Sequence, residues 1–225
     1  MSQISIQVVD TFAEMRIDTG AMNIIGPDAA RDMRDGLRDL AARTDISVLV
    51  LRGRSDAFSA GLDLGVLGDE PEKAADLLKS MGEALRELAA FPVPTIAVAE
   101  GHAVAAGAML LMASTLRIGV DGDYRVGLPE VAAGMPLPAV PLMLAQHRLS
   151  PAYLERATLM GEMMIPRIAV AAGFLDQLTP ADRLVDTVNM ATESLGKLNR
   201  DAYAPTALAL RGPMIAMMDR ILAEG

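Results

Sequence analysis

A single glutamate stands apart in the middle of the sequence. Glu130 is the only ionisable residue from Val126 to Ala145, inside the otherwise apolar stretch VGLPEVAAGMPLPAV. Apolar surroundings raise the pKa of a carboxylic acid, so that it can take up and release protons near neutral pH. A glutamate on a loop more often faces water. Composition alone therefore leaves two interpretations open, a proton shuttle and an exposed loop residue.

Two glycine-bearing segments lie where a strand is expected to give way to a helix. The first is AFSAGLDL, residues 57–64, and the second is EGHAVAAGA, residues 100–108. Small residues let the main chain approach a ligand closely, and free N–H groups at a helix start attract negative charge. Two such donors can form an oxyanion hole. Junctions of this composition more often serve packing, so their spacing alone does not assign a function.

Ser59, His102 and Asp63 lie in the same two segments and raise the alternative of a hydrolytic triad. Ser59 falls in the tight turn of the first segment, however, and no serine occupies the expected helix start at Ala105–Ala108, where a nucleophile would belong. We therefore expect structural roles for these three side chains, with Asp63 as a helix cap.

Composition and charge exclude several classes of protein. The 225 residues include no Cys and only two His, which argues against disulfides, thiol chemistry and a metal centre. With 20 basic and 29 acidic residues, the net charge of −9 argues against nucleic-acid binding. The uncharged runs 103–116 and 131–146 are shorter than a membrane span, and the N-terminus lacks the pattern of a secretory signal. The sequence thus predicts a cytoplasmic protein with no nucleic-acid or membrane partner.

Strand-like and helical segments alternate along the first 180 residues, which predicts repeated α/β turns with parallel crossovers. The expected strands are Ile4–Val9, Phe12–Ile17, Ile46–Leu51, Thr95–Ala99, Leu116–Val120, Tyr124–Val126 and Phe174–Leu178; the expected helices are Ala29–Arg43, Glu72–Ala90, Ala106–Ser114, Pro151–Met160 and Arg167–Ala172. Pro180–Lys197 and Asp201–Ala223 read as helix only. We therefore place a core domain at 1–180 and a C-terminal helical region at 181–225.

Three segments form a set: AFSAGLDL, PTIAVAEGHAVAAGAMLLMASTLRIG and YRVGLPEVAAGMPLP. In this order and at these separations they resemble the crotonase, or enoyl-CoA hydratase/isomerase, superfamily, from about residue 4 to about residue 180. The resemblance implies an α/β fold, a crotonase-like spiral of repeated ββα turns with a C-terminal helical region. It also implies an acyl-CoA thioester substrate, with coenzyme A entering only as part of that substrate and no other cofactor, and assembly as a homotrimer or a dimer of trimers.

The resemblance further implies a role for individual residues. The main-chain N–H groups of Leu62 and Ala106 would hold the thioester oxygen, because fixed donors stabilise the charge that forms when a neighbouring proton is removed. Where family members usually read Gly-Gly-Gly at the second donor, this chain has Ala-Ala-Gly, whose methyl groups crowd the site. The substrate-binding residues expected in addition are Ala60, Gly61, Gly107, Met109 and Met135.

The number of glutamates separates two reactions in this superfamily. Hydratases use two, of which one matches Glu130 and the other falls on Met109, which cannot bind a proton at neutral pH. One carboxylate suits an isomerase, which removes a proton from C2 of a 3-enoyl thioester and returns it to C4. FSAGLDL, Met109 and the Gly-Leu-x-Glu at 127–130 are similar to Δ3,Δ2-enoyl-CoA isomerases, so we expect isomerisation. Hydration, another lyase or biosynthetic reaction, and acyl-CoA binding without catalysis stay as alternatives.

Overall fold

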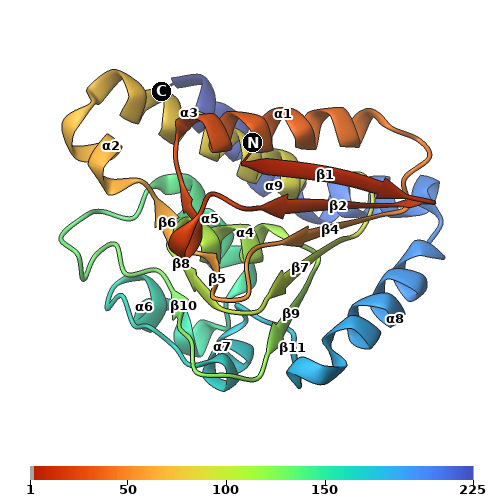
Figure 1. Ribbon diagram of the computed structural model, residues 1–225. Coiled ribbons are helices and arrows are strands. Elements are labelled where there is room, and N and C mark those ends of the chain that lie inside the picture. The colour runs from red at the N-terminus through yellow and green to blue at the C-terminus, as the bar shows by residue number, and fades with distance from the viewer. Residues whose placement is uncertain (1–2, 225) are drawn as a thin grey trace.

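A six-stranded sheet organises residues 3–224, the part of the chain that the computed structural model describes (Figure 1). Its order is β1 (Ile4–Val9), β2 (Phe12–Ile17), β4 (Val48–Arg52), β7 (Thr95–Ala99), β9 (Leu116–Val120) and β11 (Gln177–Thr179). Strands β1 and β2 form the expected antiparallel hairpin, and the other neighbours pair in parallel. The mixed α/β architecture with parallel crossovers is therefore confirmed.

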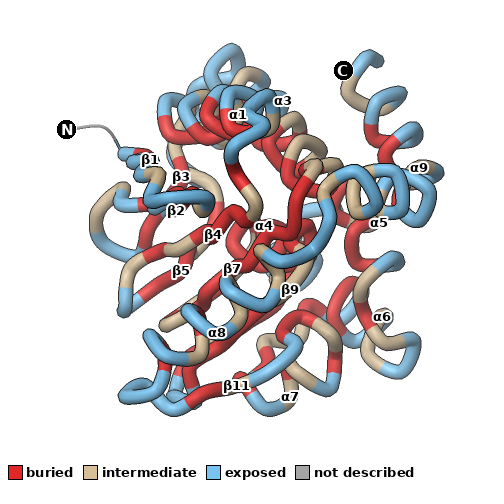
Figure 2. Tube along the Cα trace, turned by 90° about the vertical axis from the view of Figure 1, so that its right-hand side faces the viewer, coloured by how far each residue is buried: buried red, intermediate tan, exposed pale blue. Residues whose placement is uncertain are grey.

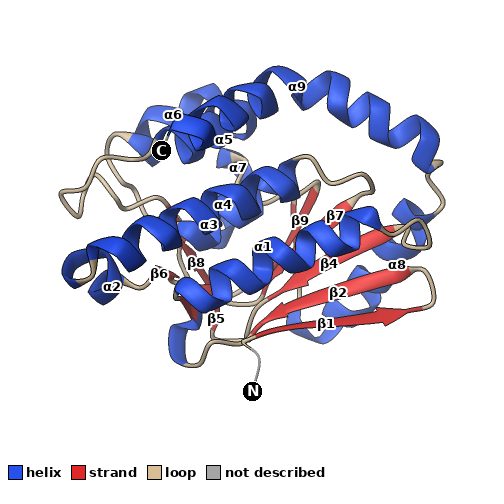
Figure 3. Ribbon diagram, turned by 90° about the horizontal axis from the view of Figure 1, so that it is seen from above, coloured by secondary structure: helices blue, strands red, loops and turns tan. Residues whose placement is uncertain are grey.

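Helices lie on both faces of this sheet or pack on the helices that do. They are α1 (Pro27–Ala42), α2 (Leu64–Asp69), α3 (Pro71–Ala89), α4 (Ala106–Ala113), α5 (Ala139–Arg148), α6 (Pro151–Thr158), α7 (Pro166–Ala172), α8 (Leu184–Gly196) and α9 (Arg200–Glu224). Side chains alternate between the two faces of a strand. In β4, Leu49 and Leu51 pack in the core that contains residues of α1 and α3, whereas Val48 and Val50 pack against residues of α8. The central strands are accordingly buried (Figure 2), with α1 and α3 in front of the sheet and α8 behind it in Figure 3.

Two small sheets carry the segments singled out for chemistry. One has the order β10 (Val126–Gly127), β8 (His102–Val104) and β5 (Ala57–Ser59), and the other pairs β3 (Ile24–Ile25) with β6 (Gly61–Leu62). Both contain only parallel pairs. They bring four separate stretches of the chain together near the start of α4.

One helix was not expected from the sequence because prolines lie at its start. Helix α5 falls in a stretch without an expected element, since it begins after Pro138 and contains Pro141 in its first turn. Proline is compatible with a helix there because the first N–H groups have no intrahelical acceptor. The last strand also begins later than expected: Phe174 and Leu175 are buried in the core, and β11 starts at Gln177.

The C-terminal region is helical, as expected. Helix α8 follows a short 3-10 turn, Ala181–Arg183, and covers the sheet, while α9 runs along α3 and α5. The domain boundary at residue 180 stays a prediction. No helix within residues 3–224 is both long enough and apolar enough to cross a membrane.

Candidate functional site

The first proposed oxyanion donor lies on β6. The N–H of Asp63 donates a hydrogen bond to the carbonyl oxygen of Ile25 in β3 at 3.0 Å. Because successive N–H groups of an extended strand point to opposite sides, the N–H of Leu62 points away from β3. Gly61 precedes it with a φ of 108°, a conformation that favours glycine. The turn therefore presents the Leu62 amide on the side opposite β3.

The second proposed donor lies at the first residue of α4. Ala105 forms the N-cap with φ 51° and ψ −116°, unusual for a residue with a side chain. Its N–H donates to the carbonyl oxygen of Gly127 at 2.9 Å, and its own carbonyl accepts from the N–H of Met109 at 3.0 Å. The N–H of Ala106 is one of the first-turn donors that have no acceptor within the helix. A carbonyl oxygen of a ligand can satisfy it.

Two glycines let these donor segments meet. A Cβ on Gly61 would lie 3.1 Å from the Cβ of Ala105 and 3.8 Å from the nitrogen of Ala106. A Cβ on Gly107 would lie 2.3 Å from the carbonyl oxygen of Ser59, closer than side-chain atoms come. The turn through Ser59 and Gly61 thus packs directly on the start of α4. Two amides on adjoining segments can stabilise one developing oxyanion.

Glu130 is a buried carboxylate without a partner. Its residue is 7% exposed, and neither carboxylate oxygen has a hydrogen-bond partner among residues 3–224. Burial raises the pKa of the Glu130 carboxyl above its ordinary value. Of the two interpretations left open by the sequence, the structure excludes the exposed loop residue. Such an orphaned acid is typical of a site that handles protons.

The small sheet places Glu130 near the start of α4. Gly127 is bound to Ala105 through the hydrogen bond described above, and Glu130 follows Gly127 by three residues. Three residues span at most about 11 Å of extended chain. The main-chain carbonyl oxygen of Glu130 accepts hydrogen bonds from the N–H groups of Ala133 and Met135, at 3.1 and 2.9 Å, and these bonds stabilise the turn that follows Glu130. The main chain of Glu130 therefore lies within about 11 Å of Gly127, the residue that is bound to the N-cap of α4.

This burial has a consequence for stability. Because the folded state raises the pKa, it disfavours the ionised form, and stability falls as pH rises from the ordinary pKa through the raised one. Glu130→Gln removes the ionisation, so we expect it to unfold at a higher urea concentration than wild type at pH 8. The difference is expected to shrink at pH 5. Urea melts at both pH values measure it, and an equal difference at both would contradict the explanation.

An apolar cavity of about 200 Å³ adjoins the first donor segment. Leu62 and Met109 line it together with residues of α3, α5 and α9. Met109, which falls where hydratases carry their second glutamate, is buried and contributes apolar surface. Met135 is 38% exposed and does not line this cavity, so its role stays a prediction. The side of the candidate site next to α4 is therefore apolar.

Sequence reasoning missed the contributions of α3 and α9 to this cavity. Leu78, Met81 and Leu85 follow the helical spacing that any buried helix face shows. Ile221 and Leu222 come from the far end of the chain. Neither group carries a signal that separates a pocket wall from an ordinary core.

Asn23 positions the first donor segment and was also missed. It is fully buried with a φ of 51°, and its side-chain amide donates to the carbonyl oxygens of Ile17 at 2.8 Å and Phe58 at 3.1 Å. The carbonyl of Asn23 accepts from the Ser59 hydroxyl at 2.8 Å. These bonds tie the end of β2 to β5, and therefore fix the turn that follows β5.

The hydrolytic triad is not formed. Ser59 is bound to Asn23, His102 accepts a hydrogen bond from the N–H of Arg125 at 3.2 Å, and Asp63 accepts from two N–H groups of α2. Among the described residues, no hydrogen bond joins these three side chains to one another. Asp63 is the helix cap that the sequence predicted.

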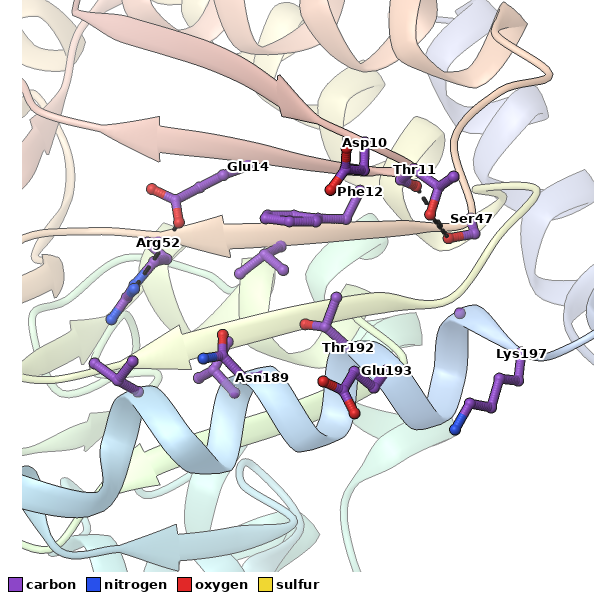
Figure 4. A pocket seen from close by; sticks show the side chains of 14 residues that line it. Asp10, Thr11, Phe12, Glu14, Ser47, Arg52, Asn189, Thr192, Glu193 and Lys197 are labelled. Carbon is purple, nitrogen blue, oxygen red and sulfur yellow. Dashed lines mark hydrogen bonds and ion pairs between the residues drawn. The ribbon is translucent and has the colours of Figure 1, made fainter.

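A larger cavity of about 520 Å³ lies elsewhere, between the β1–β2–β4 side of the sheet and α8 (Figure 4). Its lining is mixed: Glu14 and Arg52 lie at one end and Thr11 and Ser47 at the other, and apolar residues that include Phe12 line it between them. None of the predicted site residues lines it. Within residues 3–224, no group of three or more His, Cys, Asp or Glu side chains is placed to hold a metal ion.

Comparison with known proteins identifies the family of the chain. The family model described as enoyl-CoA hydratase/isomerase matches residues 8–214. A Thermus thermophilus protein that carries the name enoyl-CoA hydratase is 30% identical over 201 residues, which cover 86% of this chain and 75% of that protein. A Mycobacterium avium protein named as a probable enoyl-CoA hydratase is 28% identical over 73% of this chain, and the match spans only 64% of its length.

Solved structures show the same fold. An enoyl-CoA hydratase/isomerase family protein from Pseudomonas syringae superposes with a TM-score of 0.93 at 31% identity, covering 99% of this chain and 96% of that one. A Mycobacterium tuberculosis protein, described as an enoyl-CoA isomerase in one solved structure and as a probable enoyl-CoA hydratase in another, gives in the former a TM-score of 0.91 at 29% identity, with coverage of 99% and 96%. The crotonase-like α/β fold expected from the motifs is therefore confirmed. On the match over residues 8–214 and these relatives, the chain belongs to the enoyl-CoA hydratase/isomerase family, the crotonase superfamily.

Proposed function

We propose that the protein is an enoyl-CoA isomerase that moves the double bond of a 3-enoyl-CoA from position 3 to position 2. The observation that carries the proposal is the buried carboxylate of Glu130, which has no partner among the described residues and follows by three residues the Gly127 that is bound to the N-cap of α4. Met109, one turn into α4, supplies no second acid. One base and one oxyanion hole are the requirements of this reaction.

The steps balance with one proton shuttle. Ionised Glu130 takes the proton from C2, and the electron pair of that C–H bond forms a dienolate whose charge lies on the thioester oxygen, where the amides of Leu62 and Ala106 stabilise it. The C3–C4 double bond stays in place at this stage; its electron pair binds the proton at C4 in the next step, while the enolate electrons form the C2–C3 double bond and the thioester carbonyl is restored. Protonated Glu130 then returns the proton to C4, which leaves the conjugated 2-enoyl thioester and the ionised acid. Burial of the carboxyl keeps water away from both proton transfers. The raised pKa brings the acid closer to the working pH.

Coenzyme A is part of the substrate in this proposal, and no further cofactor is needed. The predicted substrate-binding residues Ala60, Gly61 and Gly107 lie on the two donor segments, consistent with main-chain contact to the thioester. We also propose assembly as a homotrimer or a dimer of trimers, in the cytoplasm. Exposed apolar side chains on the C-terminal helices support self-association: Val185, Met190, Leu208 and Leu210.

Hydration is the second candidate, favoured by the names of the Thermus and Mycobacterium avium relatives. Hydration needs water activated at one carbon while a proton reaches its neighbour, and Met109 offers neither function. The apolar wall beside Leu62 also gives an activated water no polar partner from that side.

Two substrates separate the candidates. The purified protein is incubated with 3-hexenoyl-CoA and, separately, with 2-hexenoyl-CoA, and the absorbance of the conjugated thioester is followed. We expect absorbance to rise with the first substrate and to stay constant with the second, apart from the reverse isomerisation to equilibrium. Loss of 2-hexenoyl-CoA to the 3-hydroxy product at a higher rate than isomerisation would overturn the proposal in favour of hydration. Binding of both without turnover would indicate a non-catalytic acyl-CoA binder.

A further inference from the structure

Helix α9 closes the apolar cavity, and it is firmly attached to α3. The guanidinium of Arg86 in α3 binds the carboxylate of Asp219 with an Nε–Oδ1 distance of 2.7 Å, and Arg211 donates to the carbonyl oxygen of Ala89 at 3.0 Å. Ile215 and Met218 on the same helix are buried. The end of α9 lies beside α3 (Figure 1), so Ile221 and Leu222 form a fixed wall of the cavity.

The contact between Leu222 and Gly82 sets the depth of that wall. A Cβ on Gly82 would lie 2.7 Å from Cδ2 of Leu222, so the absence of a side chain at 82 makes room for the leucine to pack against α3. Leu222 is only partly buried, whereas Met81 and Leu85 on the same cavity are 3% and 1% exposed. The two core residues cannot move without disturbing the interior. Leu222 is therefore the wall residue that can be altered at little cost to the fold.

The volume of the cavity limits what it can hold. An apolar cavity of about 150 Å³ accommodates benzene, a ligand of six carbons. By the same measure, about 200 Å³ accommodates about eight. Because Leu62 carries a proposed oxyanion donor and also lines the cavity, a thioester held there would direct its acyl chain into this space.

We infer that the site is selective for acyl chains of up to about eight carbons, and that Leu222, seated on Gly82, is the residue that sets this limit. The inference rests on the proposed function only in that the ligand is an acyl-CoA. It does not depend on which reaction follows. Shortening Leu222 to alanine removes three carbon atoms from the wall. The cavity of the variant should therefore accept an acyl chain that is longer by about the same number of carbon atoms.

Binding of saturated acyl-CoA thioesters tests this independently of turnover. Dissociation constants are measured by isothermal titration calorimetry for hexanoyl-, octanoyl-, decanoyl- and dodecanoyl-CoA. We expect wild type to bind octanoyl-CoA at least tenfold more tightly than dodecanoyl-CoA, since a misfit of one methylene in an apolar pocket already costs about tenfold. Leu222→Ala is expected to tighten decanoyl-CoA binding about tenfold, and Leu222→Phe is expected to weaken octanoyl-CoA binding.

Met217→Ala changes an exposed apolar residue of the same helix outside the cavity; it is the matched control and should keep the wild-type profile. Identical chain-length profiles for wild type, Leu222→Ala and Leu222→Phe would overturn the inference. Wild type that binds none of the thioesters would overturn both the inference and the proposed function. The expected profiles without turnover of any enoyl thioester would support the inference and overturn only the isomerase activity.

Discussion

Glu130→Gln is expected to lower kcat for 3-hexenoyl-CoA about 1,000-fold, within the range that general acid–base catalysis contributes. Glutamine has nearly the same shape but cannot accept a proton, so the C2 proton has no acceptor in the buried site. The dissociation constant for hexanoyl-CoA should change little, because the amides and the apolar wall remain. Steady-state kinetics and calorimetry on the same preparation measure the two effects.

The pH dependence of wild-type kcat/KM provides a second test of the role of Glu130. The base must be ionised, so kcat/KM should fall as pH drops through the raised pKa of Glu130. Glu155→Gln, an exposed glutamate on α6, is the matched control and should leave kcat unchanged. If Glu130→Gln kept a tenth of wild-type turnover, another group would have to move the proton, and the proposed mechanism would be wrong.

Gly107→Ala is expected to lower kcat about 100-fold or more and to destabilise the fold by about 1–3 kcal/mol. The added methyl group would meet the main-chain oxygen of Ser59 at 2.3 Å, so the turn before Leu62 must move away from the start of α4. The amides of Leu62 and Ala106 would then no longer converge on one oxygen. Kinetics with 3-hexenoyl-CoA and urea unfolding of the same variant measure the change.

Gly68→Ala is the control for this substitution. Gly68 lies in α2 with no atom within 4 Å of an added Cβ, so alanine there should be neutral or slightly stabilising. A Gly107→Ala protein with kcat within twofold of wild type would show that the contact between the two segments does not set the donor geometry.

The longer helices and strands could be predicted because their hydrophobic patterns extend over enough residues to be recognised. The apolar run Ile46–Leu51 required a strand buried on both faces, and β4 lies in the middle of the sheet at Val48–Arg52. The sequence also placed Glu130 among apolar neighbours, and its side chain is buried. Such features depend on local composition, which a single sequence contains.

The remainder depends on contacts between distant residues. Strands β3 and β6 have two residues each, too few for a periodic pattern, and exist because the parallel pairing of Ile25 with Leu62 holds them. Helix α5 was concealed by its prolines. The position of Leu222 in the cavity wall could not be predicted either, because it depends on the packing of α9 against α3, which no local sequence pattern indicates. The motifs therefore picked out segments that lie together in the fold and an acid that is buried, whereas the depth of the cavity depends on contacts that no motif contains.

The order of the sheet has a consequence for how the protein forms during synthesis. Strands β2, β4, β7, β9 and β11 are neighbours in the same order as they occur along the chain, so each emerging strand can dock on a partner already in place. The apolar cavity beside Leu62 does not share this progressive assembly, because its wall includes Ile221 and Leu222 of α9, which follows every strand. A nascent chain can thus complete its six-stranded sheet before this cavity has all of its walls, and the cavity is closed only when the final helix docks.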